Sequence, residues 1–131
     1  MQILLADDQV SLRSALRLLL EHESDIEVVG EAADANDLLA STASLQPDLI
    51  FLDWELPTIK SMTAAKRLVT ALHTIRPQVY IIALCTQIDP NRQPLLAGAD
   101  AVVSKADPPT RLLTTLRQVV TSKGARANGR L

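Results

Sequence analysis

The chain is 131 residues long, with 47% apolar and 21% charged residues. This length and composition are typical of one globular domain and exclude an intrinsically disordered protein. Thirteen Lys and Arg against fifteen Asp and Glu give a net charge of −2, which argues against a domain-wide nucleic-acid surface. The lone cysteine, Cys85, excludes an internal disulfide. No apolar run approaches the roughly 18 residues that span a membrane. We therefore expect a cytoplasmic domain that itself binds neither membranes nor nucleic acid.

Five short apolar segments alternate with segments of helical periodicity. The apolar segments are rich in Val, Ile and Leu and are mostly apolar at consecutive positions. They are residues 2–6, 26–29, 49–52, 79–85 and 101–104. A strand that is covered on one face only would alternate with polar residues. These segments therefore predict strands of a parallel sheet that is covered by helices on both faces.

Helical periodicity follows each predicted strand. Apolar residues recur three and four positions apart after the first three strands, and Pro47 and Pro77 mark the ends of the second and third helices. The fourth connection contains two prolines. We therefore expect only one or two helical turns around residues 94–97, ended by Gly98.

This alternation predicts an α/β fold of the (βα)₅ type, with a doubly wound, five-stranded parallel sheet and right-handed crossovers. We place this domain at residues 1–122. Residues 123–131 are basic, contain glycine and lack periodicity, so we interpret them as a linker or a frayed C-terminal tail.

Three carboxylates lie where predicted strands end. Asp7 and Asp8 follow the first strand, and Asp53 follows the third. The carboxyl ends of parallel strands meet at one edge of the sheet, which is where ligands of open α/β sheets bind. Clustered carboxylates repel each other unless a cation lies among them, and ligands that are all oxygen favour Mg²⁺. Each Asp alone is more simply a turn or cap residue, but their joint occurrence predicts a Mg²⁺ site.

Groups that could bind a phosphate follow the fourth and fifth strands. Cys85 and Thr86 end the fourth strand, and Lys105 follows the fifth. A carboxylate beside Mg²⁺ can attack a phosphoryl group while a nearby ammonium offsets charge on the transferring oxygens. Lys105 is the candidate ammonium. Thr86, or the weaker donor Cys85, is the candidate hydrogen-bond donor.

Residues 3–8 (ILLADD), 48–57 (DLIFLDWELP) and 98–100 (GAD), together with Lys105, form a specific combination. In this combination the chain resembles the receiver domain of bacterial two-component response regulators. The resemblance covers residues 1–122 and is closest to receivers that precede a helix-turn-helix DNA-binding output domain. It implies a flavodoxin-like fold.

The resemblance implies a role for each carboxylate. Asp53 would be the phosphoacceptor, and the donor would be a sensor histidine kinase or a phosphotransfer protein. Mg²⁺ would be coordinated by Asp8, Asp53 and the backbone carbonyl of Glu55, with Asp7 acting through water. Lys105 would contact a phosphoryl oxygen. The kinase would dock on an apolar patch of the first helix.

Two positions depart from the family pattern. The usual switch Ser or Thr is Cys85, with Thr86 beside it, and the usual aromatic residue three positions before the lysine is Val102. A thiol donates a weaker hydrogen bond than a hydroxyl, so the coupling of the phosphate to the loop would weaken unless Thr86 substitutes for Cys85. The departures lie on the signalling face and leave the acidic residues intact.

We therefore predict a signalling switch that acts in transcription regulation through an output domain. A homodimer is compatible with this prediction. The domain would catalyse only its own phosphorylation and dephosphorylation. The alternative is an interaction module that keeps the fold without phosphorylation. A third hypothesis is a small Mg²⁺-dependent phosphohydrolase with an aspartyl nucleophile. Residues 53–55 lack the second carboxylate, arranged as an acid, that is typical of such hydrolases, and no glycine-rich phosphate loop supports a nucleotide-binding enzyme.

Overall fold

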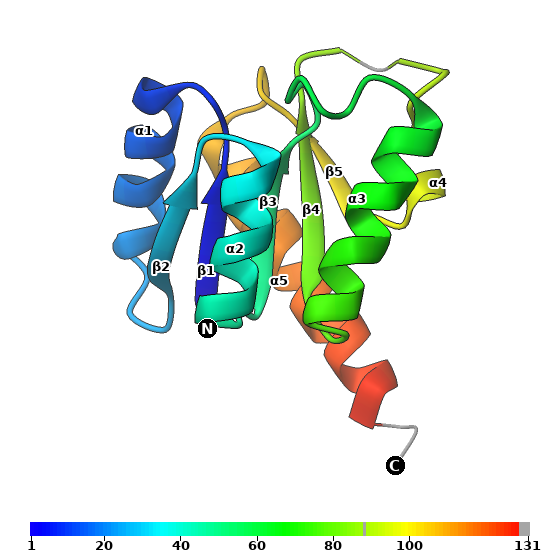
Figure 1. The fold of residues 1–131 in the computed structure, drawn as a ribbon. Helices are drawn as coiled ribbons and strands as arrows, with labels where there is room; N and C mark the ends of the chain where they lie inside the picture. Colours follow the sequence, from blue (N-terminus) through cyan, green and yellow to red (C-terminus); the bar gives the residue numbers. More distant parts are fainter. Residues whose placement is uncertain (88, 129–131) are drawn as a thin grey trace.

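A computed structural model describes residues 1–87 and 89–128, with side chains up to residue 122. One five-stranded parallel sheet has the strand order β2-β1-β3-β4-β5 (Figure 1). The strands are β1 (Gln2–Ala6), β2 (Glu27–Ala32), β3 (Leu49–Asp53), β4 (Tyr80–Cys85) and β5 (Ala101–Ser104). The helices are α1 (Val10–Glu21), α2 (Ala35–Leu45), α3 (Met62–Ile75), α4 (Pro94–Ala97) and α5 (Pro109–Asn128). This arrangement confirms the predicted doubly wound (βα)₅ fold.

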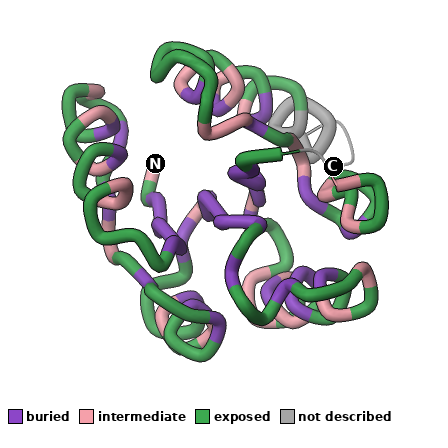
Figure 2. Tube along the Cα trace, turned by 90° about the horizontal axis from the view of Figure 1, so that it is seen from above, coloured by how far each residue is buried: buried purple, intermediate pink, exposed green. Residues whose placement is uncertain are grey.

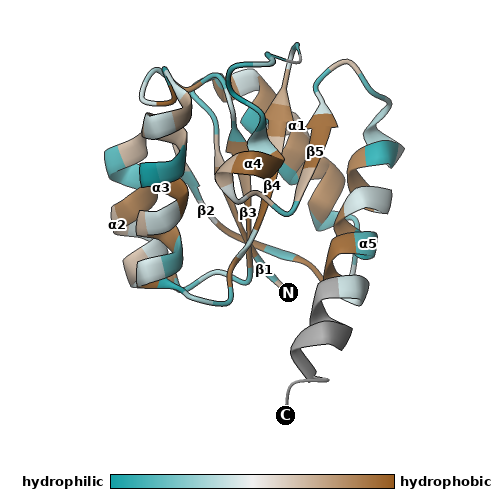
Figure 3. Ribbon diagram, turned by 90° about the vertical axis from the view of Figure 1, so that its right-hand side faces the viewer, coloured by the Kyte–Doolittle hydropathy of each residue, from teal (hydrophilic) through white to brown (hydrophobic). Residues whose placement is uncertain are grey.

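The sheet lies between two layers of helices. Successive side chains of a strand point to opposite faces, and both faces of this sheet are covered. In β3, Ile50 and Leu52 pack in the cluster beneath α2 and α3, while Leu49 and Phe51 pack in the cluster beneath α1 and α5. Figure 2 shows the buried strands enclosed by the helices, and Figure 3 shows the apolar colour of the central strands. Two buried faces explain why the strand sequences are apolar at consecutive positions.

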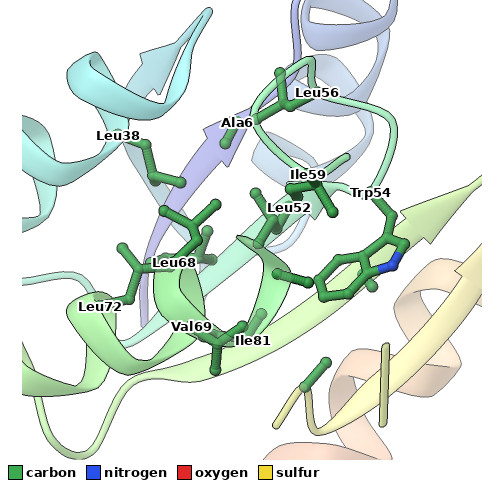
Figure 4. Packing of buried hydrophobic residues seen from close by; sticks show 14 of the residues in the cluster. Ala6, Leu38, Leu52, Trp54, Leu56, Ile59, Leu68, Val69, Leu72 and Ile81 are labelled. Atoms are coloured by element: carbon green, nitrogen blue, oxygen red, sulfur yellow. The ribbon is translucent and has the colours of Figure 1, made fainter. Parts of the chain in front are cut away.

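The hydrophobic cluster on the α2 and α3 side of the sheet extends to the carboxyl ends of the strands. Figure 4 shows Leu68, Leu72 and Ile81 in its lower part and Trp54 at one end. Trp54 follows β3 directly and is only 3% exposed. The chain beyond β3 is therefore held by the core and not only by the sheet.

Helix α4 is a single turn, as its prolines predict, and Gly98 follows it. Gly98 has φ 110°, a left-handed conformation that favours glycine. A Cβ atom here would lie 2.9 Å from the Cγ1 atom of Val69 on α3. Gly98 therefore provides both the turn after α4 and its close approach to α3.

Strand β2 differs from the prediction. It was expected at residues 26–29 but extends to Ala32, because Gly30 and Glu31 pair with β1 although they interrupt the apolar run. The Glu31 carboxylate meets Arg13 and Arg17 of α1 at 3.0 and 2.9 Å. A polar residue is therefore accommodated on this edge strand.

Helix α5 also extends further than predicted. Residues 123–128 continue the helix, where a linker or frayed tail was expected, while residues 129–131 lie outside the described residues. A single glycine weakens a helix by about 1 kcal/mol without ending it. The domain boundary at residue 122 stays a prediction. No helix in the described part of the chain is long and apolar enough to cross a membrane.

Candidate functional site: an acidic pocket at the carboxyl edge of the sheet

Three carboxylates meet where β1 and β3 end, and we refer to Asp7, Asp8 and Asp53 as the acidic pocket. Strands β1 and β3 are parallel neighbours, with Ala6 paired to Leu52, so the residues that follow come out side by side. One oxygen from each carboxylate lies within 4.8 Å of the others. Asp7 and Asp53 are each 1% exposed, whereas Asp8 is exposed. The acidic pocket therefore consists of two buried carboxylates and one that is exposed to solvent.

Lys105 provides a positive charge to this pocket. Its Nζ atom donates to Asp53 Oδ1 at 2.9 Å and lies 3.3 Å from Asp7 Oδ2. The lysine is placed by its backbone N–H, which donates to the carbonyl of Cys85 at 2.7 Å. Burial acts to lower the pKa of Lys105, but the bond to Asp53 and the charges of both carboxylates outweigh burial and raise it. Lys105 is therefore held in its charged form.

Burial raises the pKa of the Asp53 carboxyl above its ordinary value, and the charge of Asp7 acts in the same direction. The bond from Lys105 and the backbone N–H of Glu55, which donates to Asp53 Oδ1 at 2.9 Å, oppose this rise without cancelling it. The Asp53 side chain is thus oriented by two donors, yet its charge is only partly compensated.

The oxygen atoms of this pocket fit a divalent cation. Asp7 Oδ1 accepts the backbone N–H of Gln9 at 2.8 Å, whereas the buried Asp7 Oδ2 has, within the described residues, only the ion-pair contact with Lys105 Nζ at 3.3 Å. Two buried carboxylates that share one ammonium keep a net negative charge, which a cation would compensate. The three carboxylates offer only oxygen ligands, which is the preference of Mg²⁺.

The two predicted hydrogen-bond residues are placed differently from each other. Thr86 follows β4 at the rim of the pocket, but its hydroxyl and its backbone N–H both donate to the carboxylate of Glu55. Cys85 is 5% exposed and borders a small cavity of about 180 Å³ together with Trp54 and Val102. The structure therefore brings the acidic pocket and Lys105 together, and it surrounds Cys85 with core residues.

Two contacts were not predicted from the sequence. The side-chain carboxylate of Glu55 accepts hydrogen bonds from Thr86. Burial acts to raise the pKa of Glu55, but the bonds from Thr86 outweigh burial and lower it. The indole Nε1 of Trp54 donates to the carbonyl of Arg92 at 2.6 Å. The sequence signal for both was their position directly after Asp53.

Comparison with known proteins places the chain in a family. A family model of the response regulator receiver domain matches residues 3–117. The "uncharacterized transcriptional regulatory protein YhcZ" of Bacillus subtilis (strain 168) is 35% identical over 121 residues, which cover 91% of this chain and 54% of that protein. The corresponding values for YxjL of the same organism are 31% over 119 residues, 88% and 52%. The chain spans about half the length of these curated relatives.

A solved structure supports the same assignment. The isolated REC domain of RcsB from Salmonella enterica serovar Typhimurium, in the presence of the phosphomimetic BeF3−, is 26% identical and has a TM-score of 0.75. The match covers 95% of this chain and 89% of that one. Because the family match includes residues of all five strands and every residue of the acidic pocket, the chain belongs to the response regulator receiver domains.

Proposed function

We propose that Asp53 is the phosphoacceptor of this receiver domain. The observation that carries this proposal is the position of its buried carboxylate, 2.9 Å from the Lys105 ammonium and clustered with Asp7 and Asp8. We further propose that Asp8, Asp53 and the backbone carbonyl of Glu55 coordinate Mg²⁺, with Asp7 acting through water. Three clustered carboxylates beside the single ammonium of Lys105 support a cation at this position.

The chemistry follows from these groups. When bound, Mg²⁺ neutralises charge that develops on the transferring phosphoryl oxygens. An Asp53 carboxylate oxygen attacks the phosphorus, and the bond from phosphorus to the donor's nitrogen breaks as the new O–P bond forms. Lys105 binds one phosphoryl oxygen, and Thr86 is placed to donate to another once it is released from Glu55. Cys85 stays a weaker candidate for that contact.

A sensor histidine kinase or phosphotransfer protein is the proposed phosphodonor. A groove of about 360 Å³ lies between α1 and the segment from β5 to α5, lined largely by apolar side chains and by Lys105 itself. Val10 and Leu18 of α1 are exposed by 65% and 63%. A helix of the partner packed in this groove would have its phosphohistidine near Lys105, which supports docking on the first helix.

The role of the whole protein is a proposal that depends on its relatives. Because YhcZ and YxjL are described as transcriptional regulatory proteins, we propose that phosphorylation of this domain regulates transcription through an output domain. A cytoplasmic location and a homodimer stay predictions. The family acts as a signalling switch, and we propose that this chain catalyses only its own phosphorylation and dephosphorylation.

Intact-mass spectrometry tests the acceptor. The protein is incubated with Mg²⁺ and acetyl phosphate, alongside Asp53→Asn and the control Asp37→Asn, an exposed carboxylate on α2. We expect one phosphoryl group on the wild type and on Asp37→Asn, and none on Asp53→Asn or after chelation. Folded wild type that takes up no phosphoryl group at saturating Mg²⁺ would support the alternative, an interaction module that works without phosphorylation.

A further inference from the structure

The side chain of Glu55 makes a two-pronged contact with Thr86. Glu55 Oε1 accepts the backbone N–H of Thr86 at 2.5 Å, and Oε2 accepts its hydroxyl at 2.8 Å. The same Oε2 atom lies 4.0 Å from the Nζ atom of Lys105. One carboxylate therefore uses both donors of Thr86 and approaches the ammonium of the acidic pocket.

These donors are the ones nearest to the proposed phosphoacceptor. Strands β3 and β4 are parallel neighbours in which Asp53 pairs with Leu84, so Thr86 begins the loop directly beside Asp53. Lys105 contacts Asp53 and lies within ion-pair distance of Glu55. An anion attached to Asp53 would meet Thr86 and Lys105 where the Glu55 carboxylate already lies.

We propose that Glu55 is an internal competitor that occupies the donors of the phosphoryl group, and that a phosphoryl group on Asp53 must displace it. This inference rests on the proposed role of Asp53. A phosphoryl group carries a charge of about −1.5 to −2 and repels the nearby carboxylate. The N–H and the hydroxyl of Thr86 each have one hydrogen to donate, so they cannot serve both anions at full strength. Displacement of Glu55 would free the start of the loop after β4.

The far end of that loop has a separate attachment. Trp54 lies between Asp53 and Glu55 in sequence, and its indole donates to the carbonyl of Arg92, close to the start of α4. The guanidinium of Arg92 in turn donates to the carbonyl of Ile59. The competition at Thr86 therefore affects the beginning of the loop after β4, while the bond from Trp54 to Arg92 still holds the end of that loop.

A titration with a phosphoryl mimic measures the competition. The full chain, with saturating Mg²⁺, is titrated with beryllium fluoride, and binding is followed by the fluorescence of Trp54, the single tryptophan, beside Asp53. We expect Glu55→Gln and Glu55→Ala to bind beryllium fluoride more tightly than the wild type, by up to about fivefold, the size of a partly exposed charge interaction. Glu27→Gln removes the same charge at the opposite end of the sheet and should bind like the wild type.

A second measurement follows the Thr86 amide proton, first without ligand. The Thr86 amide proton, recorded by NMR in metal-free protein, should move upfield in Glu55→Ala, because it loses a short bond to a carboxylate. It should also move when beryllium fluoride binds the wild type. An unchanged Thr86 amide in Glu55→Ala would overturn the competition.

The outcomes separate this inference from the proposed function. Wild type that binds beryllium fluoride at least as tightly as both Glu55 variants would refute the competitor and leave the phosphoacceptor intact. No binding by the wild type or by either variant, with Mg²⁺ present, would overturn both proposals. Asp53→Asn, which removes the attachment point, should bind no beryllium fluoride in any background.

Discussion

Replacing Lys105 by methionine tests whether the acidic pocket behaves as a buried charge cluster. Methionine keeps most of the apolar stem and removes the ammonium. The two carboxylates that Lys105 contacts, Asp7 and Asp53, are each 1% exposed, and the lysine side chain is 13% exposed. Removing one partner of a buried ion pair costs about 3–5 kcal/mol, against about 0–1 kcal/mol for an exposed pair. Proton uptake by one carboxylate limits the loss, so we expect about 3 kcal/mol.

Urea unfolding at neutral pH in the presence of a chelator measures this loss. Lys66→Met, an exposed lysine on α3, serves as the matched control and should change the free energy of unfolding by less than about 0.5 kcal/mol. Added Mg²⁺ should stabilise Lys105→Met more than the wild type, because the cation then compensates two uncovered carboxylates. A loss below about 1 kcal/mol with an unchanged denaturant slope would show that the pocket is effectively solvated, and the reasoning from burial would be wrong.

Three further predictions concern single residues. Asp53→Asn should raise the free energy of unfolding of metal-free protein, because burial raises the pKa of Asp53 and its ionisation opposes folding. Urea curves should show no gain below pH 3.8, where the unfolded carboxyl is protonated too, and a gain that grows above it until the folded carboxyl is also ionised. Burial raises the pKa of the Cys85 thiol to about 11, so iodoacetamide should modify it slowly at pH 8 in folded protein and readily in urea; equal rates would contradict its burial. Gly98→Ala should lower the free energy of unfolding by about 2 kcal/mol or more, since φ is 110° and the new Cβ would meet Val69. Thermal unfolding should show a smaller loss of stability for Gly98→Ala in a Val69→Ala background. An equal loss in both backgrounds would assign the cost to backbone strain.

The strands that position the acidic pocket were predictable because a parallel strand is recognisable from its own consecutive apolar residues. A run such as 49–52 is apolar at every position only when both faces are covered, and the residue that ends it must lie at the carboxyl edge. Asp7, Asp53 and Lys105 then meet because three strands end at the same edge. Their proximity follows from topology and requires no knowledge of side-chain conformations.

The contacts of Glu55 and Trp54 were not predictable in the same way. Glu55 and Thr86 are 31 residues apart, and Trp54 and Arg92 are 38 apart. Each pair joins two irregular segments whose paths are set by turns and not by a repeating period. The polar end of β2 was missed for a related reason, because Gly30 lowers strand propensity while its pairing with β1 keeps it in the sheet.

The position of the Trp54 side chain relates the contacts of Glu55 and Trp54 to the signalling face, where Val102 lies. Val102 on β5 is 36% exposed and has no ring that could move between a buried and an exposed position. The ring in this region belongs to Trp54, which borders the same small cavity as Val102 and Cys85. Trp54 adjoins Asp53 in the chain, and its indole donates to the carbonyl of Arg92 just before α4, so the segment after β3 holds the end of the loop that leads to α4. Lys105, which follows β5, contacts Asp53, whereas the contact with the loop before α4 comes from the segment that follows β3.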